Sequence, residues 1–366
     1  EMEEIQKQAK KNCGILEISG CMESQKAHLM YGLSGLFPCH LVIAADEKSA
    51  KELYEDYRFY DKRVYYYPAK DLLFFQADIH GNLLIRQRMQ VIRALLERED
   101  EITVVTSIDG CMDYLAPLEK IEKQLIHFRN DSTLDMDKLT AALVHMGYER
   151  VGQVEMPGQF SIRGGIIDIY SLTEENPWRI ELWGDEIDSI RSFDAQSQRS
   201  LENLDDVTIY PAAEQPMEKN GVSFLDYFKE TETLFFLDEL NHLEENAKAV
   251  QEEFQQSCEN RKEKGEISLS GDWMCTWEEL CHKINDRNCV AMSLLDPKKS
   301  NWKISGQFNI TVKSMSSYQS SFELLVKDLK QYKKEGYQIV LLSGSRTRAE
   351  RLAKDLQEEG LNAFYG

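Results

Sequence analysis

The chain has 366 residues, of which 42% are hydrophobic and 29% are charged, and its formal net charge is −20. This composition is ordinary for a globular protein of two to four domains. The negative charge argues against a large duplex-DNA footprint, because phosphate contacts need clustered Lys and Arg. The sequence shows no signal peptide and no apolar run of about 18 residues. We therefore expect a cytoplasmic chain whose main partner is a protein.

The eight cysteines form no CxxC pair, so we expect them to be reduced thiols. Cys275, Cys281, His282 and Cys289 could be imagined as a zinc site, but their spacing matches no usual pattern. No metal site is predicted.

Strands and helices alternate over residues 14–114, which indicates a parallel α/β layer. Continuous apolar runs such as CHLVIAA are typical of strands buried on both faces. The expected strands are 14–19, 39–45, 63–67 and 102–106. The expected helices are 23–33, 47–59, 81–97 and a short one around 109–115.

The turn after the first strand occupies the place of a phosphate-binding loop. Such a loop needs G-x-x-x-x-G-K-[ST], whose backbone N–H groups hold phosphates and whose hydroxyl holds magnesium. Gly20 and Lys26 keep their places here, but Gln25 replaces the second glycine and Ala27 replaces the hydroxyl residue. Glu23 adds a negative charge that would repel phosphate. The pattern predicts an NTPase-like scaffold with a degenerate, inactive nucleotide site, so that this chain is not an enzyme and holds no cofactor.

A second acidic motif follows the predicted strand 234–237. Asp238-Glu239 with His242 has the form of a metal-holding, water-activating motif. The alternative is that Asp238 caps the long helix 240–264. We favour the capping role, because two carboxylates cannot hold Mg·ATP without a working phosphate loop.

The stretch 159–201 predicts strands with two different faces. The alternation of apolar and polar residues ends at Gly184-Asp185, where a two-residue hairpin turn fits. Closing the hairpin there pairs Leu182 with Ile187 and Ile180 with Ser189.

The other face of this hairpin carries Arg179 and Trp183. An exposed Trp flanked by Arg on a rigid sheet has the composition of a protein-binding hot spot. The residue pattern alone favours the alternative, in which Trp183 packs beneath a helix and the charges are solvated, because Trp is highly buried on average.

Three strings carry a family resemblance: Ser161-Ile-Arg-Gly-Gly-Ile-Ile-Asp-Ile, Arg179-Ile-Glu-Leu-Trp-Gly-Asp-Glu-Ile, and Ser192-Phe-Asp followed by Gln198-Arg-Ser-Leu. They closely resemble the UvrB-homology module of the excision-repair protein UvrB and of the bacterial transcription-repair coupling factors (Mfd). In both families this module binds UvrA. The resemblance implies UvrA-contacting positions at Arg163, Arg179 and Trp183, all exposed, where the last is often Phe in the family.

The same resemblance offers two functions. UvrB has an intact ATP-binding loop and a long aromatic hairpin that it wedges into DNA. The degenerate loop and the short segment 65–86 favour instead the N-terminal, UvrA-recruiting module of a coupling factor. ATP, Mg, RNA polymerase and duplex DNA would then belong to motor and polymerase-binding domains outside this chain. The alternative is an active UvrB-like ATPase that loads on damaged DNA.

The resemblance also implies the order of domains along the chain. We expect an α/β, parallel-sheet domain of the P-loop-NTPase type, interrupted by an inserted α+β domain and followed by the start of another α/β domain. The expected limits are domain 1a at 1–118, the UvrA-binding domain 2 at 119–206, domain 1b at 207–305 and the start of domain 3 at 306–366.

Within this order, domain 2 should open with a strand over 123–128 and a helix over 134–146 that is capped by Asp131 or Ser132. Strands 207–210 and 234–237 should return to the first sheet. The last part should hold helices 318–334 and 346–358 and strands 338–343 and 361–365. Two strands cannot bury a core of their own, which predicts a piece of a longer protein.

Overall fold

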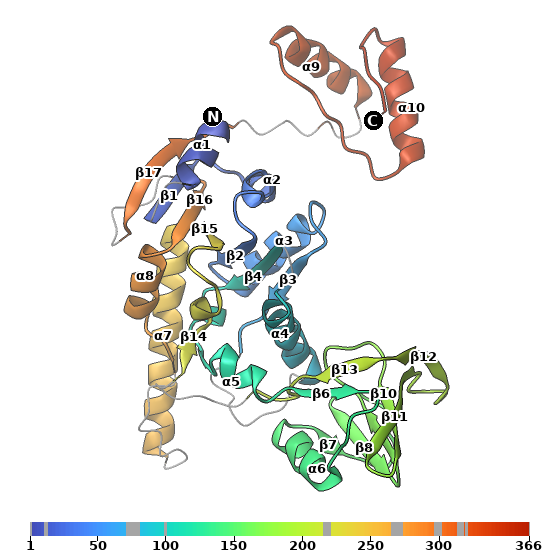
Figure 1. The fold of residues 1–366 in the computed structure, drawn as a ribbon. Helices are drawn as coiled ribbons and strands as arrows, with labels where there is room; N and C mark the ends of the chain where they lie inside the picture. Colours follow the sequence, from blue (N-terminus) through green and yellow to red (C-terminus); the bar gives the residue numbers. More distant parts are fainter. Residues whose placement is uncertain are drawn as a thin grey trace. The chain divides into compact units, whose positions relative to one another are not determined.

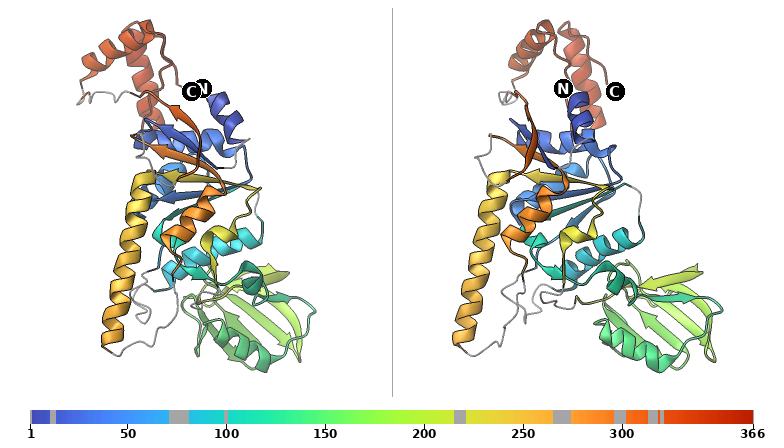
Figure 2. Two further views of the ribbon diagram at one scale, coloured as in Figure 1. Left: turned by 90° about the vertical axis from the view of Figure 1, so that its left-hand side faces the viewer. Right: turned by 60° about the vertical axis from the view of Figure 1, so that its left-hand side comes forward.

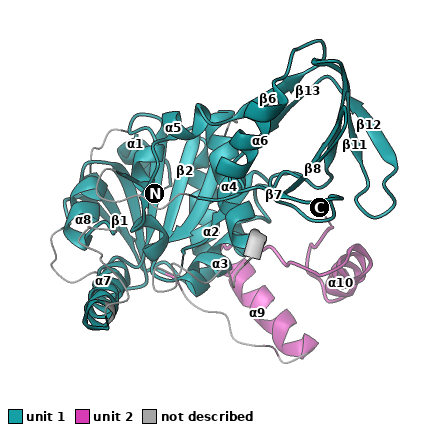
Figure 3. Cartoon of the chain, turned by 90° about the horizontal axis from the view of Figure 1, so that it is seen from below, with its two compact units in different colours: residues 1–311 teal, residues 312–366 magenta. Residues whose placement is uncertain are grey.

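The structure is a computed structural model that describes residues 2–10, 14–70, 81–98, 101–214, 221–264, 274–295, 302–312, 318 and 321–365. The chain divides into two compact units, residues 1–311 and residues 312–366 (Figure 3). The expected α/β class is confirmed, because a large parallel sheet with additional smaller sheets organises the first unit. None of the described helices is both long and apolar enough to cross a membrane.

Seven parallel strands form the first sheet in the order β17-β1-β16-β15-β2-β4-β3. Four of them were predicted to within two residues, and β15 joins the sheet as expected. Two strands from the later part of the chain were not predicted: β16, which lies between β1 and β15, and the edge strand β17. The bounds are β1 (Gly14–Ser19), β2 (Cys39–Ala44), β3 (Val64–Tyr67), β4 (Ile102–Ser107), β15 (Thr233–Asp238), β16 (Asn288–Ser293) and β17 (Ile304–Asn309).

Helices cover both faces of this sheet (Figures 1 and 2). One face packs α1 (Met2–Ala9), α2 (Glu23–Ser34) and α3 (Glu47–Tyr57). The other packs α4 (Gly81–Leu96), α7 (Leu240–Glu263) and α8 (Trp277–Asn285). Successive strand residues alternate between the two cores: Leu41 and Ile43 enter one, Val42 and Ala44 the other. Burial on both faces explains the continuous apolar runs of the sequence.

The second sheet has six strands in the order β12-β11-β10-β9-β8-β7. Helix α6 (Met136–His145) lies against one side of it (Figure 1), where Leu139 and Leu143 pack on Ile167 and Ile180. The bounds are β7 (Glu149–Arg150), β8 (Gln159–Arg163), β9 (Ile166–Ile169), β10 (Trp178–Trp183), β11 (Glu186–Phe193) and β12 (Ser200–Leu204).

Two details of this region correct the predictions. The cap of α6 is Asp135, which accepts from the backbone N–H of Lys138, and not Asp131 or Ser132. Asp131 instead forms a left-handed turn and donates its backbone N–H to the carbonyl of Ile187. In the β10–β11 hairpin Leu182 pairs with Ile187 as predicted, but a bulge shifts the register, so Ile180 pairs with Ile190 and not with Ser189.

Short elements connect the two sheets. The strand at 207–210 was wrongly assigned to the first sheet: β13 (Asp206–Ile209) pairs antiparallel with β6 (Ile126–Arg129). The helix expected around 109–115 is a 3-10 turn, η2 (Asp109–Cys111), followed by β5 (Tyr114–Leu115), which pairs with β14 (Val222–Ser223). Helix α5 (Leu118–Glu122) and the 3-10 turn η3 (Phe224–Tyr227) complete the connections.

The second unit contains α9 (Phe322–Lys334) and α10 (Arg346–Glu358), close to the helices predicted. The strands expected at 338–343 and 361–365 are not formed, since no neighbouring strand among the described residues pairs with them. Val340 and Leu342 are accordingly 75% and 95% exposed.

The expected domain limits fall inside elements. The division after residue 118 lies in α5, the one after 206 in β13 and the one after 305 in β17. Strand β17 belongs to the first sheet, and the two units part after residue 311. The segment 65–86, predicted to be too short for a DNA-wedging hairpin, lies partly outside the described residues.

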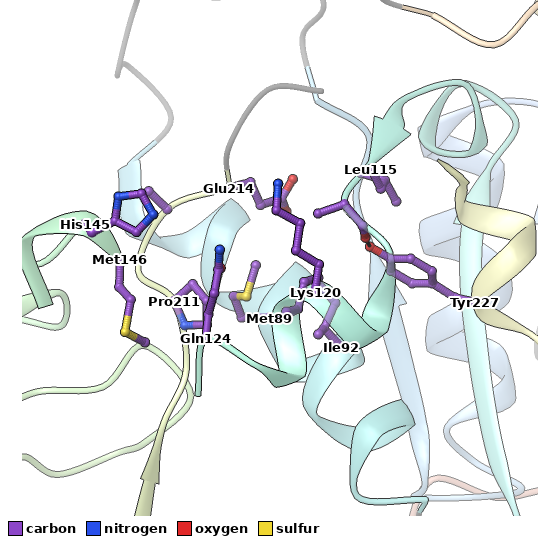
Figure 4. Close-up of a pocket in the computed structure, with 13 residues that line it drawn as sticks. Met89, Ile92, Leu115, Lys120, Gln124, His145, Met146, Pro211, Glu214 and Tyr227 are labelled. Carbon is purple, nitrogen blue, oxygen red and sulfur yellow. Dashed lines mark hydrogen bonds between the residues drawn. The ribbon is translucent and has the colours of Figure 1, made fainter. Parts of the chain in front are cut away.

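A buried ionic cluster joins the first sheet to the returning end of the inserted region. The Arg88 guanidinium, fully buried in α4, contacts Glu214 at 2.6 Å and Asp113 at 3.0 Å. Lys70 forms a second ion pair with Glu214, and the Arg88 guanidinium lies 4.2 Å from the centre of the Tyr67 ring. A small cavity of about 40 Å³ lies beside Glu214 (Figure 4). Arg88 is therefore the point at which four separate segments meet.

We predict that Arg88→Met lowers the free energy of unfolding by about 3–5 kcal/mol, because it removes the buried cation that pairs with Asp113 and Glu214. Urea denaturation at neutral pH measures the change. Arg58→Met is the matched control. Arg58 is exposed, and its contacts are with Glu55 at 3.4 Å and with the Tyr54 ring, so its loss should change stability little. Similar midpoints for the two variants would contradict the prediction.

The same cluster predicts acid lability. Burial alone would raise the pKa of Glu214, but the Arg88 and Lys70 charges lower it to about 2. The stability contributed by this ionised carboxylate should be present above its ordinary pKa of 4.5 and lost as the pH falls from there toward 2. Denaturation midpoints of the wild type should fall more steeply over this range than those of Glu214→Gln. Parallel profiles would show that Glu214 does not contribute.

Candidate functional site

Lys26 lies in the first turn of α2 and its side chain is fully buried. Its Nζ atom lies 2.6 Å from Asp238, 2.8 Å from Glu23 and 3.0 Å from Glu239. Burial alone would lower the pKa of Lys26, but the surrounding carboxylates, Asp238 first, raise it. The ammonium that a phosphate loop would offer to a nucleotide is thus already surrounded by three acidic side chains, which we call the Lys26 cluster.

Asp238 does not cap α7, so the favoured prediction for it was wrong. The residue before the helix is Glu239, which has a φ of 53° and makes no side-chain cap. Asp238 instead ends β15 with its carboxylate against Lys26. Burial raises the pKa of Asp238 to about 6, with Lys26 opposing the shift. Three carboxylates around one ammonium leave surplus negative charge, which favours holding a proton at this position.

The remaining residues of the degenerate loop also make internal contacts. Gln25 accepts the backbone N–H of Met22 at 3.4 Å, and Ala27 is buried. Gly20 has a φ of +80°, and a Cβ added there would lie 2.0 Å from the carbonyl oxygen of Ile310. The chain that follows β17 therefore lies directly against the turn. All six predicted residues of the degenerate site meet at this carboxyl end of the sheet.

We predict that the chain does not bind Mg·ATP. A phosphate would have to displace three carboxylates from Lys26, and no hydroxyl follows the lysine to hold magnesium. Isothermal titration calorimetry at neutral pH should give no saturable heat with Mg·ATP. Micromolar, magnesium-dependent binding would contradict the prediction.

The second candidate region is the face of the six-stranded sheet opposite α6, centred on Asp168. This carboxylate is 1% exposed, and its two oxygens accept from Arg179 Nε at 2.6 Å and Arg179 Nη2 at 2.9 Å. Arg163 Nη2 also donates to it. Two of the three predicted contact residues are therefore joined through a buried acid that the sequence analysis did not single out.

Arg179 is more enclosed than predicted. Its side chain is only 14% exposed, Nη2 also donates to Gln198 at 2.9 Å, and the guanidinium lies 4.4 Å from the centre of the Phe193 ring. The expectation that Arg179 is exposed was wrong, because the alternation of strand residues places it directly across from Asp168.

Trp183 is 83% exposed, and Arg163 retains 46% of its side-chain exposure. The alternative in which Trp183 packs beneath a helix is therefore wrong. The backbone N–H of Leu182 donates to the carbonyl of Gly165 at 2.8 Å, so the β8–β9 turn lies beside the end of β10. An added Cβ at Gly164 or Gly184 would meet nothing within 4 Å. We call this edge, formed by Arg163, Gly164 and Trp183 to Gly184, the turn edge.

The six-stranded sheet that carries these side chains lies within a segment that matches a known protein family. Residues 126–214 fit the model of the UvrB interaction domain family. This segment is similar to the UvrB interaction domains. The resemblance drawn from the strings at Ser161, Arg179 and Gln198 is thereby confirmed.

Similar curated proteins cover more of the chain. A transcription-repair-coupling factor of Bacillus subtilis (strain 168) is 28% identical over 421 aligned positions, spanning 94% of this chain and 35% of the relative. Coupling factors of Staphylococcus aureus (strain MRSA252) and Staphylococcus haemolyticus are each 35% identical, over 45% and 44% of this chain and 14% of their own lengths. The chain thus spans about a third or less of these relatives.

The matched segment also holds side-chain contacts that the sequence analysis missed. Asp168 was not singled out, although the same string that named Arg163 contains it. Its role follows from the strand register, which places it opposite Arg179. Gln198 gave no comparable signal, since its contact depends on a left-handed backbone at φ 60°.

Proposed function

We propose that this chain recruits UvrA for transcription-coupled nucleotide excision repair, through the turn edge of its UvrB interaction domain. The family match and the names of the relatives support this role. The observation that carries it is Trp183, a large aromatic residue that is 83% exposed on a rigid sheet beside a partly exposed arginine. Interface hot spots are enriched in Trp and Arg, which supply desolvated centres and directional hydrogen bonds.

The energetic roles differ among the three predicted residues. Trp183 would bury its indole in an apolar pocket of the partner, because so much of its surface is open to solvent. Arg163 would add a charge-assisted hydrogen bond from its exposed guanidinium. Arg179 would support this edge from beneath, since Asp168, Gln198 and Phe193 already hold it.

The alternative, an active UvrB-like ATPase, is less well supported because of the Lys26 cluster. We propose that any ATP hydrolysis, polymerase binding and duplex-DNA translocation belong to parts of the relatives that this chain does not match. Mg and ATP would be cofactors of those parts alone. The chain itself would act as the recruiting module.

We predict that Trp183→Ala and Arg163→Ala each weaken UvrA binding by about 2 kcal/mol or more. The melting temperature should change little for Trp183→Ala, whose side chain is exposed. It should fall less for Arg163→Ala than for Arg179→Ala, because Asp168 then keeps both hydrogen bonds to Arg179. Arg179→Ala should reduce both binding and stability, because it leaves buried Asp168 with fewer partners. Surface plasmon resonance with purified UvrA, together with thermal melts, measures both quantities.

Val144→Ala provides the control for this experiment. Val144 is 56% exposed on α6, which covers the opposite side of the sheet, so UvrA affinity should not change. A Trp183→Ala protein that melts early and binds UvrA normally would refute the proposed interface.

A further inference from the structure

We infer that Asp168 is a positioning residue for the recruitment surface: it holds Arg163 in place so that this arginine can pair with a carboxylate of the partner. The inference rests on the proposed function and adds to it a division of labour between the two arginines and the chemical class of the group that Arg163 recognises.

The register of the sheet places Asp168 at the centre. It lies opposite Ser161 of β8 and Arg179 of β10, so strands on both sides send side chains toward it. Arg179 reaches it from the neighbouring strand, and Arg163 reaches it from further along β8. A carboxylate that is 1% exposed needs such partners, because an unpaired buried charge is strongly disfavoured. Arg163 and Arg179 are thus held in place by their hydrogen bonds to the buried carboxylate of Asp168.

The contacts divide the roles of the two arginines. Arg179 uses Nε and Nη2 on Asp168 and shares Nη2 with Gln198, and its guanidinium lies close to the Phe193 ring. Arg163 contacts Asp168 through Nη2 and keeps nearly half of its side chain in solvent. Arg179 therefore neutralises and orients Asp168, whereas Arg163 is the arginine presented to a partner.

Charge indicates what Arg163 would recognise. Two guanidinium groups and one carboxylate leave a net charge of one positive unit at this position. The end of the neighbouring hairpin is negative instead, with Asp185, Glu186 and Asp188 all exposed. A partner that fits the turn edge therefore presents a carboxylate to Arg163 and an apolar pocket to Trp183. Pairing with Asp168 limits the rotamers of Arg163 before binding, so that less conformational freedom is lost in the complex.

The test is a double-mutant cycle with UvrA as the ligand. Asp168→Asn keeps the size of the side chain and removes its charge, and it should reduce UvrA affinity about tenfold. In an Arg163→Ala background the same change should cause little further loss, because Asp168 acts through Arg163. Asp188→Asn, a carboxylate-to-amide change at an exposed position of β11, is the matched control and should leave the affinity unchanged.

A merely structural role predicts a different result, namely equal losses from Asp168→Asn in both backgrounds, and that additivity would overturn the inference. Wild-type affinity for Asp168→Asn would overturn it as well. If this variant does not fold, Asp168→Glu, which keeps the charge but displaces it by one methylene, is used in the same cycle with the same expectation. Wild-type binding by both Trp183→Ala and Arg163→Ala would instead refute the proposed function, and this inference with it.

Discussion

Strand β1 has no neighbour from its own half of the chain, and the rest of the first unit depends on this constraint. Its two partners are β16 and β17, more than 250 residues later in the sequence. The first sheet can therefore be completed only after the chain has passed through residues 126–214, the segment that matches the UvrB interaction domain family. The Lys26 cluster also joins segments that are distant in the sequence, since it pairs a residue of α2 with Asp238 and Glu239 at the end of β15. The six-stranded sheet is consequently inserted in the sequence between strands of the first sheet.

Internal ion pairs neutralise the buried charges of the first unit. The Lys26 ammonium contacts three carboxylates of the chain itself, and Arg88 fixes the returning end of the insertion through Glu214. On the second sheet, Asp168 in turn holds Arg163 and Arg179. In each place a buried charge is satisfied within the chain. The turn edge, in contrast, leaves a large aromatic residue and a partly exposed arginine open to a partner.

The sequence predicted what local patterns determine. Apolar runs such as 39–45 located the strands, and the departures at Gln25 and Ala27 pointed to the altered loop. Prediction from the sequence failed where the structure of a residue depends on segments that are distant in the chain. β17 alternates between half-buried and exposed residues at the sheet edge and gave no apolar run, and a bulge that no local signal marks shifted the pairing of Ile180. The burial of Arg179 could not be predicted either, because it requires knowing that Asp168 lies opposite on β9.

The central claim is that this chain binds its partner through the turn edge, and that the Lys26 cluster prevents a ligand from binding at the carboxyl end of the first sheet. Hydrogen–deuterium exchange of the chain, alone and with UvrA, tests both parts at once. The account predicts slower exchange in the β8–β9 turn and the β10–β11 hairpin, with the Gly20–Lys26 turn unchanged. Protection confined to the Gly20–Lys26 turn, or to α6, would contradict it.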